Sequence, residues 1–284
     1  MASSQSSRTW FITGASTGFG RLLAAELLKR GEQVGATARS LAQIEDLARK
    51  YPGKAKAFVL DVTKPDQIAA AAAQAIQAFG HIDVLVNNAG YGVSGAIEEV
   101  SEEEFEPMFQ TNIYGLIRTT RVFLPHFRER KSGHIINFSS IAGLIGTPGW
   151  GFYATTKFAV EGFSEALAGE MNPLGVHVTV IEPGPFRTDF LGRSGKLAER
   201  EIPDYAQSAG KARQYLKTQN GKQPGDPRKA IEAVIAVVDS PNPPVHLLLG
   251  RTALVRFRGK LEQWEKEIAA WESVTTGADF PEGE

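Results

Sequence analysis

Two residues of the chain, Tyr153 and Lys157, are spaced so that they could act together on a proton. They stand four positions apart in GFYATTKFAVEGFSEAL, which begins at Gly151 and whose apolar residues recur at roughly helical spacing. Side chains four residues apart lie one above the other on a helix, so the phenol and the ammonium would be within reach of each other. The pair could form an activated acid, although a Tyr-x-x-x-Lys taken alone more often marks a packed tyrosine and a solvent-directed lysine.

A second candidate site is the glycine-rich stretch TGASTGFG, Thr13 to Gly20, which directly follows a predicted strand and leads into a predicted helix. Glycine lets the backbone approach a pyrophosphate closely, and the helix N-terminus supplies free N–H groups and partial positive charge. The stretch therefore favours a dinucleotide. Its spacing is G-x-x-x-G-x-G, and glycine turns occur in many loops, so its position at the first strand-to-helix turn carries the argument.

Composition restricts the classes of function. The chain has 284 residues, 42% of them hydrophobic, so we expect one domain spanning 1–284. Lys+Arg 31 against Asp+Glu 32 give a net charge of −1, which does not favour a nucleic acid partner. The absence of cysteine excludes disulfides and thiolate nucleophiles, and the five histidines lack metal-ligand spacing, so no metal site is expected. The polar N-terminus and the lack of a long apolar run predict a soluble cytoplasmic protein without a membrane segment.

Short β-branched or apolar runs alternate with longer helical patterns. Seven runs predict strands, at 9–13, 33–38, 56–61, 83–88, 134–139, 177–182 and 245–249. Helices are predicted over 21–31, over 65–80, from a capping box at Ser101 and Glu104 through about 112 and beyond, and over 228–239 after Asp226 and Pro227. This alternation implies right-handed βαβ units. We therefore expect an α/β, doubly wound Rossmann-type parallel sheet of about seven strands with helices on both faces.

Two further segments have expected roles. The segment 183–226 is rich in glycine, proline and charge, and we expect it to be the least regular part of the chain, with a mobile substrate lid at about 186–225. The C-terminal segment 251–273 has the pattern of an amphipathic helical extension that packs on the domain or contacts another subunit.

Taken together, the motifs resemble the short-chain dehydrogenase/reductase family, in particular its carbonyl reductase and hydroxysteroid dehydrogenase-like members. The resemblance covers roughly residues 8–250 and rests on TGASTGFG, NNAG at 87–90, Asn112, FSSIAG at 138–143, Tyr153, Lys157 and PGPFRTDF at 183–190. It implies a catalytic tetrad of Asn112, Ser140, Tyr153 and Lys157. Ser140 is preferred to Ser139 because family members place the serine thirteen residues before the tyrosine.

The resemblance also implies a role for each tetrad residue. Tyr153 would exchange a proton with the substrate oxygen while hydride moves to or from a nicotinamide. The ammonium of Lys157 and the positive nicotinamide would lower the pKa of the Tyr153 phenol from about 10 by about 3 units. Ser140 would orient the substrate oxygen, and Asn112 would hold a water that joins Lys157 to solvent.

The implied cofactor site is large. Its residues are Gly14, Ser16, Thr17, Gly18, Phe19, Gly20, Arg39, Asp61, Val62, Asn88, Ala89, Gly90, Tyr153, Lys157, Pro183, Gly184, Phe186 and Thr188. A carboxylate at the end of the second strand would bind a ribose hydroxyl, whereas an arginine would pair with a 2′-phosphate. The chain has Ala38 and Arg39 there, which favours NADP (NADPH) over NAD. Thr17 departs from this trend, since many NADP-preferring members carry a basic residue at that position.

The substrate side is predicted only in outline. Apolar and aromatic residues near the site suggest a pocket for an aromatic or aliphatic ketone or a steroid-like or retinoid-like molecule, and they are Tyr91, Ile141, Trp150, Phe186, Phe190 and Leu191. The function expected is an NADP(H)-dependent ketoreductase. The alternative is a catalytically silent NADP-binding sensor on the same fold.

The resemblance further implies a homodimer or homotetramer. Association would use the helices that begin near Ser101 and Gly151, whose outer faces are expected to carry Phe109, Phe123, Phe163 and Leu167.

Overall fold

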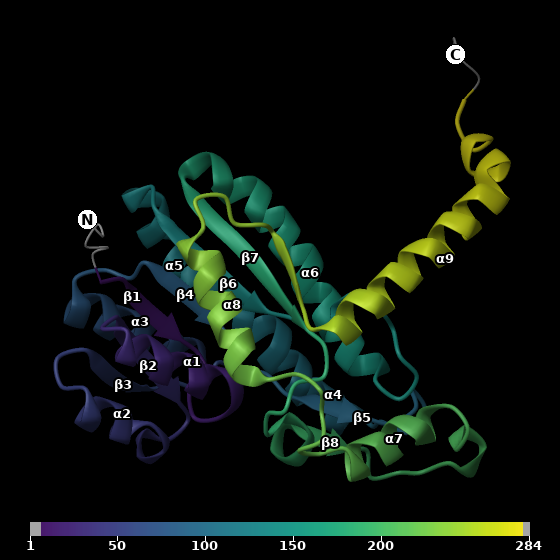
Figure 1. Cartoon of the computed structure of the whole chain (residues 1–284), viewed down its shortest axis with the longest axis horizontal. Coiled ribbons are helices and arrows are strands. Elements are labelled where there is room, and N and C mark those ends of the chain that lie inside the picture. The colour runs from purple at the N-terminus through teal and green to yellow at the C-terminus, as the bar shows by residue number, and fades with distance from the viewer. Residues whose placement is uncertain (1–6, 281–284) are drawn as a thin grey trace.

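The computed structural model describes residues 7–280, and its centre is a parallel sheet of seven strands (Figure 1). The strands are β1 (Thr9–Ile12), β2 (Gln33–Ala38), β3 (Ala55–Val59), β4 (Val84–Asn87), β6 (Gly133–Phe138), β7 (Val176–Pro183) and β9 (His246–Leu249). Their order is β3-β2-β1-β4-β6-β7-β9, and all neighbouring pairs are parallel. The strand prediction is confirmed, with ends that differ by one or two residues.

Helices cover both faces of this sheet because its strands bury side chains on both sides. Along β1, Trp10 and Ile12 point into one core with α1 (Gly18–Lys29) and α8 (Pro227–Asp239). Phe11 points into the other core, with α3 (Pro65–Phe79), α5 (Leu116–Arg130) and α6 (Gly151–Met171). The short α2 (Glu45–Lys50) lies beside β3. The doubly wound α/β fold is thus confirmed.

The order of the strands also locates a site. From β1 the chain proceeds outward to β2 and β3, then returns to place β4 on the other side of β1. In such sheets ligands bind at the carboxyl ends of the strands, at the point where the order reverses. The loops that follow β1 and β4 therefore frame the expected binding crevice.

The helix predicted from Ser101 continues much further than residue 112 and is irregular inside. It comprises α4 (Glu102–Phe109), a π-helical turn (Gln110–Gly115) and α5. The predicted capping box is present, since the Ser101 backbone N–H donates to the Glu104 carboxylate at 2.9 Å. The π-helical turn was not predicted, and it contains Asn112.

The segment 183–226 is the least regular long segment of residues 7–280, as predicted, although it folds into several short elements. It contains a π-helical turn (Phe190–Ser194), the strand β8 (Gly195–Leu197) and α7 (Ala209–Thr218). β8 pairs in parallel with β5 (Gly92–Ser94), a strand about a hundred residues earlier. Short 3-10 turns occur here (Pro203–Tyr205) and elsewhere (Leu41–Gln43, Ile141–Gly143, Asn172–Leu174).

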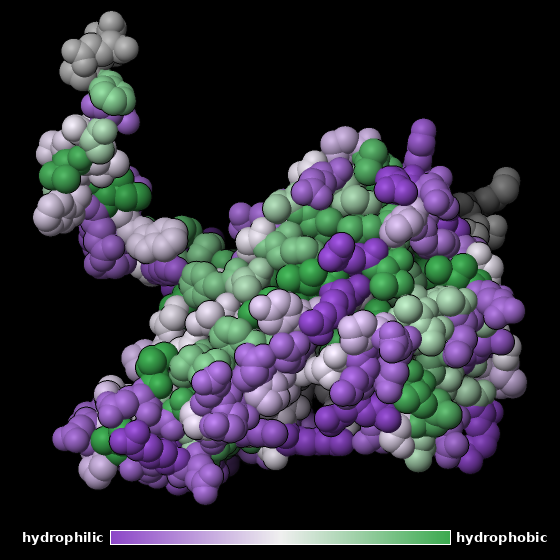
Figure 2. Space-filling model, turned by 180° about the vertical axis from the view of Figure 1, so that it is seen from behind, coloured by the Kyte–Doolittle hydropathy of each residue, from purple (hydrophilic) through white to green (hydrophobic). Residues whose placement is uncertain are grey.

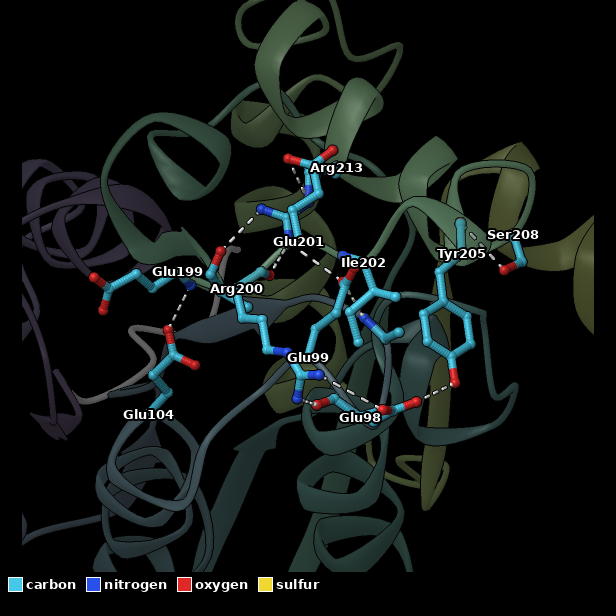
Figure 3. A network of polar contacts seen from close by, with 12 residues as sticks. Glu98, Glu99, Glu104, Glu199, Arg200, Glu201, Ile202, Tyr205, Ser208 and Arg213 are labelled. Carbon is cyan, nitrogen blue, oxygen red and sulfur yellow. Dashed lines mark hydrogen bonds and ion pairs between the residues drawn. The ribbon is translucent and has the colours of Figure 1, made fainter.

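A polar network ties this segment to the loop before α4 (Figure 3). Arg213 of α7 is only 5% exposed and lies 3.3 Å from the carboxylate of Glu99. Glu99 also accepts from the backbone N–H groups of Ala96 and Ile202, both at 2.8 Å. Tyr205 donates to Glu98 at 2.8 Å. Arg213 is buried because its charge is matched by that of Glu99.

The C-terminal helix, α9 (Arg251–Thr276), is three residues longer than predicted and projects away from the sheet (Figure 1). Its first turns contact the domain: Ala253 is buried, Arg256 donates to Thr147 Oγ1 at 2.8 Å, and Lys260 donates to the Leu144 carbonyl. Residues 261–276 are all exposed. Figure 2 shows apolar and hydrophilic side chains interleaved along this projecting helix.

The faces predicted for subunit contact are partly wrong. Phe123 and Leu167 are buried in the core shared by α3, α5 and α6. Phe109 and Phe163 are half-buried and pack against core residues. Phe123 and Leu167 face inward because α5 and α6 lie on the sheet, so these two side chains do not belong to an outer apolar surface. Within residues 7–280, no helix combines the length and the apolar character needed to cross a membrane.

Candidate active site

A cavity of about 1220 Å³ lies over the carboxyl ends of the strands. Loops after six strands contribute to its wall, through Gly14, Arg39, Asp61, Asn88, Ser140 and Gly184. Of the predicted site residues, Asn112 and Gly20 lie outside the lining and all the others belong to it. The structure therefore brings the predicted cofactor, catalytic and substrate residues to one place.

The glycine-rich turn is shaped by close contacts that only glycine permits. Gly14 has a φ of +68°, and a Cβ there would lie 2.9 Å from the Ala89 Cα. A Cβ on Gly20 would lie 2.5 Å from the Asn88 amide nitrogen. The helix α1 begins at Gly18, three residues before the predicted start, so its free N–H groups point from the turn itself. The turn fits the pyrophosphate of a dinucleotide.

Thr13 fastens this turn to the NNAG loop. Its hydroxyl accepts from the backbone N–H groups of Asn88 at 3.0 Å and Ala89 at 3.1 Å. In return, the Asn88 side chain donates to the carbonyls of Thr13 and Gly14, both at 3.0 Å. Thr13 was not among the predicted site residues. Its place at the end of β1, directly before Gly14, is the signal that would have identified it.

Tyr153 and Lys157 lie in the first two turns of α6, and both are nearly buried, at 8% and 6% exposed. The Lys157 ammonium lies 5.7 Å from the centre of the Tyr153 ring and donates to the Phe138 carbonyl at 2.8 Å. Burial lowers the pKa of Lys157 to about 8, an effect that the carboxylate of Glu161 opposes.

The pKa of Tyr153 moves in the direction opposite to the expected one. Burial raises the pKa of the phenol to about 12, and the hydroxyl of Ser140 opposes the shift. The side chains around Tyr153 therefore do not by themselves lower the pKa of its phenol, as had been expected of Lys157. The desolvation of the phenol exceeds the stabilisation that they provide.

Ser140 and Ser139 occupy different environments at the end of β6. The Ser140 hydroxyl caps the turn Ile141–Gly143 by accepting from the Ala142 N–H at 3.1 Å. It also opposes the rise in the pKa of Tyr153. Ser139 is buried, and its hydroxyl donates to the Lys157 carbonyl at 3.5 Å. This contrast supports Ser140 as the serine that meets a substrate.

Asn112 is held firmly in the π-helical turn. Its side-chain amide donates to the Tyr91 carbonyl at 2.8 Å and to Thr156 Oγ1 at 3.0 Å, and its oxygen accepts from the Tyr91 N–H at 3.1 Å. Both N–H donors of the amide are thereby used, which leaves one lone pair on the oxygen for a further donor. A water held by the Asn112 side chain stays a prediction.

The far end of the cavity contains the residues predicted to meet the adenosine. Ala38 is buried at the end of β2, whereas Arg39 is exposed and has no ion-pair partner within residues 7–280. Asp61 accepts from the backbone N–H of Thr63 at 2.9 Å and from its hydroxyl at 2.7 Å. The end of β2 therefore presents a guanidinium and no carboxylate to the cavity.

Aromatic side chains form a cluster in the cavity wall. The ring centres of Tyr153 and Phe190 are 5.6 Å apart, and that of Trp150 lies 5.7 Å from Tyr153 and 6.2 Å from Phe190. Phe186 lies instead near Phe19, with ring centres 5.6 Å apart. Phe186 thus belongs to the cofactor side as much as to the substrate pocket.

The sequence prediction missed the polar and cationic part of this wall. Arg193, Lys196, Lys211, Arg256 and Gln223 also line the cavity. They belong to the segment 186–225 and to α9, neither of which was predicted to contribute a charged residue to the site.

A second group of titratable residues connects α6 with the strands β7 and β9. Glu161 of α6, Glu182 of β7 and His246 of β9 have ligand atoms within 4.8 Å of one another. The His246 Nδ1 lies 2.7 Å from Glu182 Oε1 and 3.6 Å from Glu161 Oε2. The carboxylates raise the pKa of His246 to about 10, so its imidazolium supplies positive charge between them. The sequence analysis could not predict this cluster from motif spacing, because its members come from three separate elements.

Comparisons with known proteins agree with this geometry. The family model described as short chain dehydrogenase matches residues 8–197. The chain is 38% identical over 255 residues to Oxidoreductase BOA17 of Botryotinia fuckeliana (strain B05.10), covering 89% of this chain and 92% of that protein. It is 37% identical over 254 residues to 3-ketodihydrosphingosine reductase of Bacteroides thetaiotaomicron, covering 89% and 91% of the two chains.

Solved structures extend the likeness. A short-chain dehydrogenase from Streptomyces avermitilis is 40% identical with a TM-score of 0.91, covering 97% of this chain and 100% of that one. A short-chain dehydrogenase/reductase from Burkholderia phymatum in complex with NAD is 25% identical with a TM-score of 0.80, covering 92% and 95%. An alcohol dehydrogenase from Thermococcus sibiricus complexed with 5-hydroxy-NADP is 27% identical with a TM-score of 0.71, covering 85% and 95%.

The fold and the site define a nucleotide-dependent oxidoreductase, and the chain belongs to the short-chain dehydrogenase/reductase family. It is an enzyme that acts on CH–OH groups and on small-molecule substrates. Structural neighbours hold NAD or NADP.

Proposed function

We propose that the chain is an NADP(H)-dependent oxidoreductase that interconverts ketones and secondary alcohols, with Tyr153 as general acid and base. One observation carries the proposal: Tyr153, Ser140 and Lys157 line the same cavity as the glycine turn that begins at Gly14. A nucleotide held at this turn and a proton donor on the opposite wall would act on a substrate placed between them.

Each catalytic residue of the cavity would have its own role in the reaction. A bound nicotinamide nucleotide supplies or accepts the hydride. Tyr153 would donate its phenolic proton to the carbonyl oxygen during reduction and take it back during oxidation. The hydroxyl of Ser140 would hold that oxygen against Tyr153 and share its developing charge. The Lys157 ammonium, near the Tyr153 ring, would stabilise the phenolate that remains.

The preference for NADP rests on the end of β2. Arg39 is exposed on the cavity wall, and its guanidinium could bind a 2′-phosphate with two parallel hydrogen bonds. The side chain of Ala38 neither repels that phosphate nor offers a carboxylate to a ribose hydroxyl. Both features favour NADP over NAD.

The carbonyl chemistry rests on the aromatic wall and on the relatives. Trp150, Phe190 and Tyr91 line the cavity beside Tyr153, so an apolar group attached to the carbonyl would be desolvated there. The Bacteroides relative is a 3-ketodihydrosphingosine reductase, which supports reduction of a ketone.

The test is a panel of ketones with NADPH and NADH, and of secondary alcohols with the two oxidised nucleotides. We expect turnover of apolar ketones with NADPH well above that with NADH. Tight NADPH binding without turnover of any member of the panel would contradict the catalytic proposal and favour a nucleotide-binding sensor.

A further inference from the structure

The substrate end of the cavity carries a concentration of positive charge. Four cationic side chains line it, Arg193, Lys196, Lys211 and Arg256, and the neighbouring acidic member of the lining is Asp189. The chain as a whole has a net charge of −1, so this excess is local.

Contacts place three of these cations beside the aromatic wall rather than at the nucleotide end. The Lys196 ammonium lies 5.1 Å from the centre of the Tyr91 ring. Arg256 donates to Thr147, three residues before Trp150. Lys211 adjoins Ala212, whose Cβ would be 2.6 Å from a Cβ placed on Gly149.

None of the four cations has an ion-pair partner among the ion pairs of residues 7–280. By contrast, Arg213, which lies on the same helix as Lys211, is buried against Glu99. Like charges gathered at a concave, partly apolar surface repel one another and focus a field that attracts an anion. The four cations are exposed to solvent and line the cavity, so an anionic group of a ligand could pair with them there.

We propose that the substrate is an amphiphile: its apolar part, next to the carbonyl, lies against Trp150 and Phe190, and an acidic head group, a carboxylate or a phosphate, lies among Lys196, Lys211 and Arg256. This inference rests on the proposed function, because it concerns the substrate of the same site. It narrows the ketone expected from the sequence to one that carries negative charge at a distance from its carbonyl.

The experiment compares straight-chain oxo-carboxylates of increasing length with their methyl esters, using NADPH. A second arm uses hydroxyketone phosphate monoesters and the corresponding free alcohols. At the best chain length, we expect kcat/KM for the acid to exceed that for the ester by about tenfold or more, the scale of a hydrogen bond to a charged group. The ratio should fall as salt is raised, because exposed charges are screened.

A double variant, Lys196→Gln with Lys211→Gln, should reduce this acid-to-ester ratio toward one. The matched control is Lys217→Gln with Lys222→Gln, which removes the same charge from exposed residues outside the cavity lining and should keep the ratio. Esters reduced as well as acids at every length would overturn the inference and leave the proposed function intact. No reduction of any ketone would instead overturn the proposed function.

The exposed part of α9 carries an independent inference, because its apolar residues repeat every three and four positions. Leu254, Phe257, Leu261, Trp264, Ile268 and Trp271 follow this spacing without interruption. A repeat of this kind forms one seam along a helix and is the pattern of a coiled coil. Trp264 is 50% exposed and Trp271 63%, so in the single chain the outer part of the seam, from Leu261 onward, is uncovered.

The charged residues beside the seam distinguish the possible partners. Arg258 and Glu265 flank one side of it, and Lys260 and Glu267 flank the other. If two copies run antiparallel with Leu254 opposite Trp271, Arg258 meets Glu265 of the other copy, and this pair occurs twice. In the parallel arrangement Glu267 meets Glu272, which is repulsive. Acidic residues also dominate the outer half of α9, which disfavours an anionic membrane surface.

We infer that α9 pairs with α9 of a second copy as an antiparallel two-helix coiled coil. At about 1.5 Å per residue, the stretch 254–271 that forms the six apolar layers spans about 27 Å of this helix. Lys260 also fixes the base of the helix to the domain, through the Leu144 carbonyl.

Sedimentation velocity of the full chain with Ile268→Glu tests this pairing. The variant places a charge on the seam and should turn dimer into monomer at micromolar concentration. The control is Ala269→Glu, which adds the same charge one residue away and off the seam, and it should stay dimeric. Equal association of the two variants would overturn the proposal.

The orientation can be tested with disulfides because the chain has no cysteine. Under oxidation, a mixture of Leu254→Cys and Trp271→Cys proteins should yield the mixed disulfide. Leu254→Cys cross-linked to itself would show a parallel pair and overturn the orientation. A dimer that forms no cross-link, as expected if α9 docks on the partner's domain, would overturn the coiled coil.

Discussion

The Lys157 ammonium donates to the Phe138 carbonyl at 2.8 Å and lies 5.7 Å from the centre of the Tyr153 ring. The lysine is thus fixed by the end of β6 and not by the tyrosine. Burial raises the pKa of Tyr153 and lowers that of Lys157, so each group is shifted toward its neutral form. A neutral phenol is the form required of a proton donor in ketone reduction.

Tyr153→Phe should remove that proton and leave the nucleotide site nearly unchanged. We expect turnover to fall by at least about 10²-fold, the usual scale for a general acid, while the Kd for NADPH stays within about twofold. Tyr114→Phe, an exposed tyrosine outside the cavity lining, is the control. Retention of turnover by Tyr153→Phe would show that another group donates the proton.

Lys157→Met should shift the pH profile of alcohol oxidation. Oxidation needs the phenolate, and loss of a nearby positive charge raises the pKa of Tyr153, so the acidic limb should move to higher pH. Because the pKa of Lys157 is about 8, the wild-type lysine is charged mainly below that pH, where the difference should be largest. Lys157→Arg keeps the charge and should shift the limb less. Superimposed profiles for wild type and Lys157→Met would contradict an electrostatic role.

Arg39→Ala should weaken NADPH and barely affect NADH. Charge-assisted hydrogen bonds to a phosphate contribute roughly 1.5 to 3 kcal/mol, or about 10- to 150-fold in affinity. Adding Ala38→Asp should turn the preference toward NADH by repelling the phosphate. Kd values from fluorescence titration decide the matter, since an Arg39 that only stacks on the adenine would lose both nucleotides equally.

His246→Gln should destabilise the fold in a pH-dependent way. Contacts with Glu161 and Glu182 raise the pKa of His246 from 6.5 to about 10. A raised pKa in the folded state means that the stabilisation is complete below about pH 6.5 and is lost as pH rises through about 10. The Tm difference between wild type and variant should therefore be large near neutral pH and shrink near pH 10. His177→Gln, on an exposed histidine, should show no such trend.

Arg213→Met should loosen the segment 186–225. Removal of one partner of a buried ion pair leaves the other charge uncompensated, at a cost of roughly 3 to 5 kcal/mol. Limited proteolysis of the variant should cut this segment faster than in wild type, and nucleotide with ligand should protect it in both. Arg200→Met removes an exposed arginine of the same network and should change little. Equal cutting of the two variants would mean that the ion pair with Glu99 does not hold the segment.

The seven-stranded sheet could be predicted because each of its strands has a local sequence pattern, a short β-branched or apolar run between helical patterns. The strand β8 could not, because three residues, Gly195–Leu197, become a strand only by pairing with Gly92–Ser94 far away in the sequence. The inward orientation of Phe123 and Leu167 depends on how α5 and α6 rest on the sheet, which periodicity alone leaves open.

The candidate site, too, could be predicted only in part from the sequence. The identity of its residues followed from motifs and from the family resemblance, and the cavity contains nearly all of them. The direction of the Tyr153 pKa shift did not follow, since it depends on how completely the fold removes water from the phenol. The cationic wall was missed because Lys196 and Lys211 belong to elements that the sequence did not reveal.

The π-helical turn Gln110–Gly115 amounts to one extra residue inserted into an otherwise continuous helix. Deletion of a single residue from it should restore an unbroken α-helix without disturbing the sheet. The first half of the helix would then turn by about 100° relative to the second, since an α-helix has 3.6 residues per turn. Asn112 would lose its hold on Tyr91 while the tetrad sequence stayed complete. The register of one helix is therefore as strict a requirement for this site as the chemistry of its side chains.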